Sequence, residues 1–371
     1  MLQKTQKLIA KNKISAFLIT GRSNIKYLCG FSGSSGFLLI TKSKTILFTD
    51  SRYIERAKYT VPKSIELIDI TRVWRNPTEL KKAWQQKIRS LRISKIGVEE
   101  SDLTVSEYKK FKKISPKIKF TDISGEIETL RAIKTPAEIK LITKSQRINE
   151  QVFELIKKLI HKQVKSRTQI SETSIAWEIK RLGQELGAED VSFDPIVAFG
   201  KNSSMPHHQP GKTKLKKGDL VLIDMGMKYK GYCSDMTRII FTATPTKLQK
   251  EIYETVLAAQ KAALKTTNNG FVEQKIDSLA RTPITEAGYS ENFGHGTGHG
   301  IGLKIHESPS LSPNGKNKIK PGMVITVEPG IYLPGKFGIR IEDMAIVTKT
   351  GLKNITHLNK DIDFRYNPPR I

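Results

Sequence analysis

Buried-looking aspartates are the first residues whose types and spacing indicate chemistry. Asp224 and Asp235 lie eleven residues apart in GDLVLIDMGMKYKGYCSDMTRIIF, where two apolar runs flank a Lys-Tyr-Lys-Gly turn. A carboxylate within an apolar strand is unfavourable unless it is paired or binds a metal. A hairpin could point both carboxylates at one metal ion. Alternatively, they could cap turns or pair with Arg238.

A histidine cluster lies further along the chain, in FGHGTGHGIGLKIHE. His295, His299 and His306 occur within twelve residues and are interspersed with five glycines. The glycines argue against a regular helix, predict a loop and allow the backbone to approach a ligand closely. Imidazole is a common metal ligand and general acid or base. One such histidine alone would more often be structural, but the cluster indicates a site.

Two glutamates follow in apolar surroundings. Glu328 comes directly after the apolar run VITV and before Pro329. Glu342 is predicted to lie inside a strand over Gly338–Thr348, with Arg340 on the same face because side chains alternate along a strand. The alternative is that Glu342 and Arg340 form only an ion pair.

A polar loop, NSSMPHHQP, precedes the first aspartate and carries His207 and His208. Histidines in such loops can be ordinary surface residues. Their position just before the Asp224 strand also allows a role in a site, and the loop alone does not decide between the two.

Taken together, five groups could hold two divalent ions, because carboxylates can bridge metals. Oxygen-rich ligation favours Mn²⁺ and other relatively hard ions over thiolate-binding ones. Two metals about 3.5–4 Å apart can hold and deprotonate a bridging water, so that no protein nucleophile is needed. No GxSxG turn or phosphate-binding loop competes with this interpretation. The five groups are Asp224, Asp235, His299, Glu328 and Glu342.

The elements before this region predict a small α/β domain. Short apolar runs alternate with helical patterns, which is typical of a mixed or parallel sheet covered by helices. The predicted strands are Ser15–Thr20, Gly36–Thr41, Thr45–Thr49, Ile65–Ile70 and Ile96–Val98, and the predicted helices cover 3–13, 78–91 and 104–114.

A domain boundary is expected near residues 120–136, which gives domains over 1–130 and 131–371. Thr135-Pro136-Ala137-Glu138 is a helix-start signature with a capping box. Helices and hairpin strands then alternate, which predicts an α+β domain with an antiparallel sheet. Helices are expected from Thr135, over 172–187, from Thr246 to Asn269-Gly270 and over 273–287; strands are expected over Pro195–Phe199, Asp219–Met225, Asp235–Phe241, Val324–Glu328 and Gly338–Thr348.

Composition restricts the partners and the compartment. The net charge of +27 is densest in residues 1–130, which hold 26 basic and 12 acidic residues, but it comes as scattered lysine pairs. This pattern favours a solvated surface over a nucleic-acid partner. The chain has no apolar run long enough for a membrane span and no signal-peptide pattern. Two cysteines cannot form a disulfide framework, so a cytoplasmic protein is predicted.

The order Asp, Asp, His, Glu, Glu resembles that of the pita-bread metallopeptidases, and most of all their Xaa-Pro branch, aminopeptidase P and Xaa-Pro dipeptidase. The N-terminal stretch NIKYLCGFSGSSGFLLIT, followed by TDSRY, resembles the creatinase-like N-terminal domain of that branch. The C-terminal resemblance is carried by NSSMPHH, DMGMKYKGYCSDMTR, HGTGHGIGLKIHE, TVEPGIY and GIRIED.

The resemblance implies a role for each residue. The five groups named above would be the ligands of two divalent ions, with Mn²⁺ expected and Co, Fe or Zn as alternatives. Glu328 would also shuttle a proton. His207 and His306 would contact the substrate or the tetrahedral intermediate. His295 would be a substrate-side histidine, and Arg340 would buttress the site.

The function expected from the resemblance is that of aminopeptidase P: removal of the N-terminal residue from peptides with proline in second position, by attack of a metal-bridging hydroxide on the Xaa-Pro carbonyl. The alternative is an Xaa-Pro dipeptidase (prolidase). A third class is a non-catalytic pita-bread module that binds peptide or nucleic acid. Such modules typically lose metal ligands, and all five are present here. The resemblance also implies a homodimer.

Overall fold

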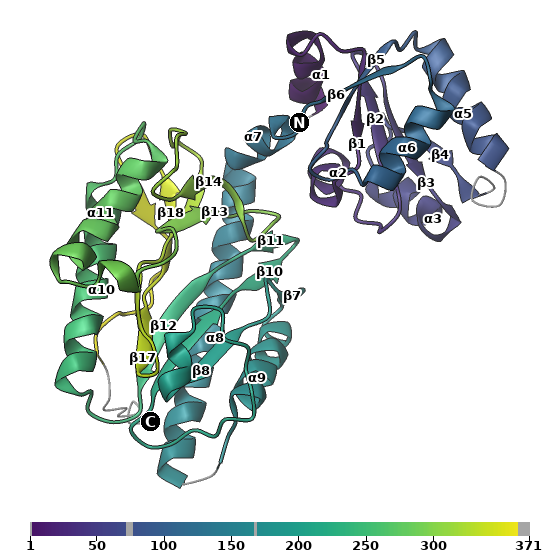
Figure 1. Cartoon of the computed structure of the whole chain (residues 1–371). Helices are drawn as coiled ribbons and strands as arrows, with labels where there is room; N and C mark the ends of the chain where they lie inside the picture. The colour runs from purple at the N-terminus through teal and green to yellow at the C-terminus, as the bar shows by residue number, and fades with distance from the viewer. Residues whose placement is uncertain (1, 72–76, 167–168, 363–371) are drawn as a thin grey trace. The chain divides into compact units, whose positions relative to one another are not determined.

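The computed structural model describes residues 2–71, 77–166 and 169–362, and the chain forms two compact units, Met1–Arg131 and Ala132–Ile371. Each unit is described by itself (Figure 1). No helix in the described ranges is long and apolar enough to cross a membrane.

The first unit is built on a mixed six-stranded sheet, as predicted. The strand order is β4-β3-β2-β1-β5-β6; β2 is antiparallel to β1 and β3, and the other neighbours are parallel. Alternate residues of β1 enter different cores, Ala16 and Leu18 on one face and Phe17 and Ile19 on the other. Both faces are therefore covered. The strands are β1 Ala16–Ile19, β2 Phe37–Thr41, β3 Thr45–Thr49, β4 Glu66–Asp69, β5 Lys95–Val98 and β6 Lys119–Asp122.

Helices cover this sheet. The structure contains the predicted helices α1, α5 and α6, and in addition α2, α3 and α7, which the periodicity did not indicate. The edge strand β6 was also not predicted, because its residues, KFTD, are polar at both ends and none of them is fully buried. The helices are α1 Leu2–Lys11, α2 Arg22–Cys29, α3 Ser51–Thr60, α5 Pro77–Ser90, α6 Val105–Ile114 and α7 Glu126–Ala132.

Four long helices frame the second unit. The predicted capping box opens α8: the Glu138 amide donates to Thr135 Oγ1 at 3.3 Å, and the Thr135 amide donates to Glu138 Oε2 at 2.8 Å. A second capping box, Thr246 with Gln249, opens α10. The helices are α8 Pro136–Ser166, α9 Glu172–Glu185, α10 Lys247–Thr266 and α11 Glu273–Glu286, with short 3₁₀ helices η1 Gly200–Ser204 and η2 Ser290–Asn292.

The strands of the second unit are all paired antiparallel, which confirms the α+β prediction, but they form four sheets rather than one. One sheet contains β7 Asp190–Val191, β10 Met227–Tyr229 and β11 Tyr232–Cys233, and the next contains β8 Ile196–Phe199, β9 Leu220–Met225 and β12 Met236–Phe241. The largest contains β13 Gly298–Gly300, β14 Glu307–Leu311, β15 Val324–Val327, β18 Asp343–Val347 and β19 Leu352–Asn354, and the last pairs β16 Gly330–Leu333 with β17 Phe337–Arg340.

The hairpin of β9 and β12 lies at the centre of this unit. On β9, Val221 and Ile223 pack with residues of α8 and α9, whereas Leu220 and Leu222 pack with residues of α10. Helices therefore cover both faces of the hairpin (Figure 1). Asp224 follows the alternation of Leu220 and Leu222, so its carboxylate lies on the α10 side of the strand.

The single strand predicted over Gly338–Thr348 is wrong. β17 ends at Arg340 and pairs with β16, whereas β18 begins at Asp343 and pairs with β15. The chain crosses between the two sheets at Ile341 and Glu342. Apolar alternation continues through the crossing because both strands are buried, so the sequence pattern does not reveal the change of partner.

Candidate metal centre

The structure brings the five predicted ligands to one place in the second unit. Their positions are at or next to strand ends: Asp224 in β9, Asp235 just before β12, His299 in β13, Glu328 just after β15 and Glu342 between β17 and β18. Strand ends from three different sheets meet here, so each side chain reaches the site from its own backbone segment.

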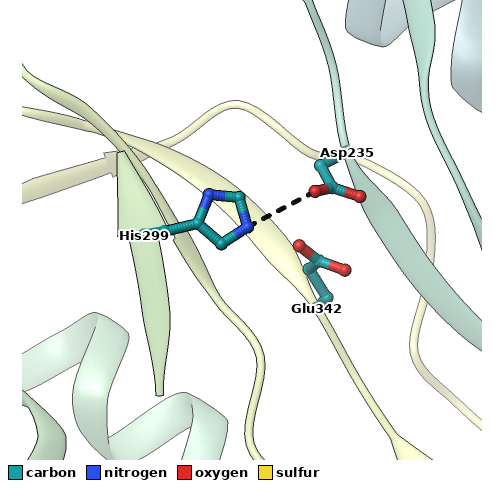
Figure 2. A group of neighbouring side chains, drawn as sticks. All are labelled: Asp235, His299 and Glu342. Atoms are coloured by element: carbon teal, nitrogen blue, oxygen red, sulfur yellow. Dashed lines mark ion pairs between the residues drawn. The ribbon is translucent and has the colours of Figure 1, made fainter. Parts of the chain in front are cut away.

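The tightest group contains Asp235, His299 and Glu342, each offering one ligand atom within 4.8 Å of the other two. Figure 2 shows the three side chains pointing toward a common point. His299 Nε2 lies 3.6 Å from Asp235 Oδ2 and 3.3 Å from Glu328 Oε1. One imidazole nitrogen and several carboxylate oxygens therefore converge without an intervening side chain.

Burial and mutual repulsion disfavour the ionised forms of Asp235 and Glu342. Burial, followed by repulsion from Glu342 and Asp224, raises the pKa of Asp235 well above its ordinary value. Burial, followed by repulsion from Glu328, does the same to the pKa of Glu342. Burial also lowers the pKa of His299, which keeps the imidazole in the neutral form that binds metals. Positive charge placed among these carboxylates would relieve the repulsion.

Unsatisfied oxygen atoms test whether a metal fits. Within the described part of the chain, Asp224 Oδ1, Asp235 Oδ1 and Glu342 Oε1 are buried and have no hydrogen-bond partner. Buried polar atoms are nearly always satisfied, so three orphaned carboxylate oxygens in one cluster require an explanation. Divalent cations supply it, because oxygen lone pairs are the ligands that hard ions prefer.

Comparison with known proteins agrees with this geometry. Residues 140–349 match the family described as Metallopeptidase family M24, and residues 1–133 match the Creatinase/Prolidase N-terminal domain. The chain belongs to metallopeptidase family M24. Membership of this family implies divalent metal ions at the cluster, whereas the identity of the ions is a separate question.

The similarity to several known proteins extends over nearly the full length of this chain. The Xaa-Pro dipeptidase of Pyrococcus horikoshii is 36% identical over 98% of this chain and 99% of its own. Among solved structures, an Xaa-Pro dipeptidase from Bacillus anthracis has a TM-score of 0.88 at 36% identity and covers 97% of this chain and 98% of that one. An X-Pro aminopeptidase from Thermotoga maritima has a TM-score of 0.86 at 34% identity and covers 97% of this chain and 99% of that one. The two-domain architecture is therefore that of a creatinase-like domain followed by a pita-bread domain.

Two threonines of the M24 domain hold the carboxylates in place. Thr326 Oγ1 donates to Glu328 Oε1 and accepts from the His299 amide, both at 3.0 Å. Thr237 Oγ1 donates to Glu342 Oε2 at 2.8 Å. The sequence analysis missed both threonines. Strand alternation could have indicated them, because residues two apart in a strand share a face. Thr326 lies two residues before Glu328, and Thr237 lies two residues after Asp235.

Arg340 buttresses the cluster through Asp224 rather than by pairing with Glu342. Its Nη2 donates to Asp224 Oδ2 at 2.6 Å, and its Nε donates to Thr237 Oγ1 at 3.0 Å. The same-face prediction for Arg340 and Glu342 is nevertheless useful, since both reach the one threonine hydroxyl. Arg340 is 3% exposed, so its charge is available almost entirely to groups inside the site.

Tyr332, which the sequence analysis did not select as a site residue, joins Arg340 to His295. Arg340 Nη1 donates to the Tyr332 hydroxyl at 2.6 Å. His295 Nδ1 lies 2.8 Å from the Gly296 carbonyl, which can only accept, so Nδ1 carries the proton. Nε2 therefore accepts from the Tyr332 hydroxyl at 2.9 Å. Burial, with Arg340 as the next cause, lowers the pKa of His295 to about 4, and burial raises the pKa of Tyr332 to about 12.

The remaining predicted histidines line a cavity of about 950 Å³ that contains the whole cluster. The His306 ring centroid lies 4.4 Å from that of His299. His207 lines the cavity as well, whereas Nε2 of its neighbour His208 is 3.0 Å from Glu172 Oε2 and so anchors the loop. The predicted site residues in the lining are His207, His295, His299, His306, Asp224, Asp235, Glu328, Arg340 and Glu342.

The glycines next to His299 have a packing role that the sequence analysis did not predict. His299 lies in the short strand β13, not in a loop. A Cβ atom on Gly298 would lie 2.1 Å from the Thr326 carbonyl oxygen, and one on Gly300 would lie 2.2 Å from the Ser308 carbonyl oxygen. Gly298 and Gly300 therefore allow the neighbouring strands to approach β13 closely.

Proposed function

We propose that this M24 metallopeptidase is an Xaa-Pro dipeptidase, which hydrolyses the bond between the two residues of an Xaa-Pro dipeptide. The observation that carries the proposal is the convergence of Asp235, His299 and Glu342, with Asp224 and Glu328 in the same cavity. Full-length similarity to proteins named Xaa-Pro dipeptidase supports the choice of substrate. The sequence analysis favoured aminopeptidase P and held this function as its alternative.

Aminopeptidase P is the second candidate. The similarity to the X-Pro aminopeptidase of Thermotoga maritima, over 97% of this chain, favours it. Both functions break the bond before proline and place the same demands on the cluster. They differ in whether a chain continues beyond the proline.

The five cluster residues would hold two divalent ions, with Mn²⁺ as the first expectation because four of the five are carboxylates. When bound, such ions polarise the scissile carbonyl and lower the pKa of a water molecule. Thr237 and Arg340 fix the orientation of Glu342 and Asp224, so the site is shaped before the substrate arrives. All five residues lie in 131–371, which we propose as the catalytic domain, preceded by 1–130.

Glu328 is placed to move the proton that the reaction requires. The nitrogen of an Xaa-Pro bond is a tertiary amide without a proton of its own. It must gain one in order to leave as an amine. Glu328 takes a proton from the attacking water and delivers it to this nitrogen. Thr326 Oγ1 donates to Glu328 Oε1 and so fixes the orientation of the carboxylate.

His306 and His207 would stabilise the developing charge. Both line the cavity beside the cluster, and either can donate a hydrogen bond to the carbonyl oxygen as it becomes negative. His295 has both ring nitrogens in hydrogen bonds with Gly296 and Tyr332. We therefore propose that His295 acts on the substrate side by fixing Tyr332 and Arg340.

The test is cleavage of paired substrates. The purified chain is stripped with chelator, supplied separately with Mn²⁺, Co²⁺ or Zn²⁺, and assayed on Met-Pro and on Met-Pro-Gly. We expect metal-dependent cleavage of Met-Pro alone. Release of methionine from Met-Pro-Gly would instead establish aminopeptidase P. Absence of cleavage with every metal would contradict both and leave the peptide- or nucleic-acid-binding module.

Three finer expectations stay predictions. These are that Mn²⁺ is the physiological ion, that the protein is a homodimer and that it is cytoplasmic. Light scattering coupled to size-exclusion chromatography measures the second directly.

A further inference from the structure

One face of α9 forms part of the wall of the cavity that contains the proposed metal ligands. Thr173, Ala176, Trp177 and Lys180 all line it, at the helical spacing i, i+3, i+4 and i+7. The helix contributes none of the proposed metal ligands. Its stripe of side chains is therefore available to contact the parts of a substrate that do not react.

Trp177 is an exposed aromatic ring held in position. Its side chain is 61% exposed, although indole rings usually bury most of their area. The Arg181 guanidinium lies 5.9 Å from the ring centroid, and Arg181 is itself held by Glu178 at 2.8 Å and by Glu185. An aromatic face that lines a cavity but is not packed into the core is suited to an apolar part of a ligand.

Lys180 carries positive charge on the same stripe. Its Nζ lies 3.5 Å from Asp190 Oδ1, and both side chains are 51% exposed, so this ion pair is weak and can be exchanged. Among the described lining residues, the basic side chains of lysine and arginine are those of Lys180 and Arg340, and Arg340 is already bound to Asp224 and Tyr332. Asp194, an acidic residue outside the cluster, also lines the cavity.

The charges of an Xaa-Pro dipeptide match this arrangement. Its carboxylate is on the proline residue, and a charge-assisted contact there needs a cation that is not already committed to the cluster. The Lys180 ammonium attracts this carboxylate. The pyrrolidine ring beside that carboxylate is apolar and small enough to pack on one face of an indole ring.

We propose that α9 forms the leaving-group subsite, with Lys180 binding the terminal carboxylate of the dipeptide and Trp177 packing against the proline ring. This inference rests on the proposed function. It makes Lys180 specificity-determining, because a peptide that continues beyond proline has no carboxylate at that position.

The test compares substrates with and without the carboxylate. Cleavage of Met-Pro and of Met-Pro amide is measured for the metal-loaded wild-type and Lys180→Met chains, and binding of both peptides to the metal-stripped chains is measured by calorimetry. We expect Lys180→Met to lower kcat/KM for Met-Pro about tenfold through KM and to leave the amide unaffected, since only the acid makes the charge-assisted contact. Trp177→Ala should weaken the binding and the cleavage of both peptides. Trp177→Phe, which keeps an aromatic ring, should retain most of the wild-type binding and cleavage.

Lys212→Met is the matched control, because Lys212 lines an adjoining cavity but not the cavity with the proposed metal ligands. Equal losses for acid and amide in Lys180→Met, or no loss in either assay, would overturn the carboxylate assignment. The binding assay distinguishes failure of the α9 subsite from failure of the proposed dipeptidase function. Tighter binding of Met-Pro by wild type than by Lys180→Met, without cleavage under any metal, would reject the dipeptidase function and retain the subsite.

Discussion

At the scale of single residues, the site consists of the proposed metal ligands and a second set of residues that hold these ligands in place. Arg340 has the central place in the second set, because it contacts Asp224, Thr237 and Tyr332. Tyr332 then fixes His295 as the tautomer with the proton on Nδ1. Outer contacts of this kind orient metal ligands and influence affinity as strongly as many direct ligands do.

The first prediction concerns the Tyr332 hydroxyl. Tyr332→Phe removes the hydroxyl that accepts from Arg340 Nη1 at 2.6 Å and leaves His295 Nε2 without its donor. We expect kcat/KM for Met-Pro to fall about tenfold or more, because a buried polar group that loses its partner costs about 1–3 kcal/mol. The control is Tyr289→Phe, which removes a hydroxyl bonded to Glu251 at an exposed position. Equal activity of the two variants would refute the role of Tyr332.

Sequence reasoning selected the residues of the cluster but not the threonines that hold them. Asp224 and Asp235 stand out because a carboxylate in an apolar strand needs a reason. Thr237 and Thr326 do not stand out, because threonine is ordinary in strands. Only the three-dimensional pairing shows that their hydroxyls contact carboxylates.

At the scale of elements, strand β13 positions His299 by very close packing. Gly298 and Gly300 flank the histidine and lie against carbonyl groups of β15 and of the segment at Ser308. A side chain at either glycine would push the strand away from its neighbours and would move the imidazole with it.

Gly298→Ala is therefore expected to lower the melting temperature and to weaken metal binding. Overpacking typically costs about 1–3 kcal/mol, and here the neighbouring atom is backbone that cannot rotate away. Calorimetric metal titration and thermal unfolding measure the two effects. Gly294→Ala is the matched control, since its Cβ would meet no atom within 4 Å. Tolerance of alanine at both glycines would show that β13 packing does not position His299.

The first unit has its own buried acid, Glu99, at the end of β5. Its carboxylate accepts from the Thr20 and Gly21 amides at 2.9 and 3.0 Å, next to the N-terminus of α2. Burial nevertheless raises its pKa from 4.5 to about 7. The native state therefore prefers the protonated form, and the associated stability is full below pH 4.5 and is lost as the pH rises through about 7.

The corresponding prediction uses Glu99→Gln, which cannot titrate. Between pH 4.5 and 8 the wild-type free energy of unfolding should fall by up to about 3 kcal/mol relative to that of Glu99→Gln. Urea unfolding at four pH values measures the difference. A difference that stays constant with pH would mean that Glu99 is ionised throughout.

Element prediction was most reliable where local chemistry fixes an end. The capping boxes at Thr135 and Thr246 located α8 and α10 correctly because they are bonds within one helix turn. The crossing at Ile341 and Glu342 was not predictable, since it depends on which distant strand each segment pairs with. The crossing is functionally important, because it frees Glu342 from a strand and places it beside Thr237.

At the scale of the whole molecule, the two units have separate cores and carry different features. The proposed ligands all lie in the second unit, whereas residues 1–130 carry about half of the net charge of +27. The order of five residue types along the sequence predicted the family, and the N-terminal stretch NIKYLCGFSGSSGFLLIT followed by TDSRY predicted the creatinase-like domain. The order of types does not distinguish a dipeptide from a longer substrate, because that distinction depends on cavity-lining residues such as Lys180.

The most direct test of the account is the metal content of the cluster. The chelator-stripped chain is titrated with Mn²⁺ by calorimetry, in parallel with Asp235→Asn and with Asp190→Asn as a surface control. We expect the wild type and the control to bind two ions with release of protons, because the pKa values of Asp235 and Glu342 are raised without metal. Asp235→Asn should lose at least one ion. Failure of the wild-type chain to bind Mn²⁺, or unchanged binding in Asp235→Asn, would contradict the central claim.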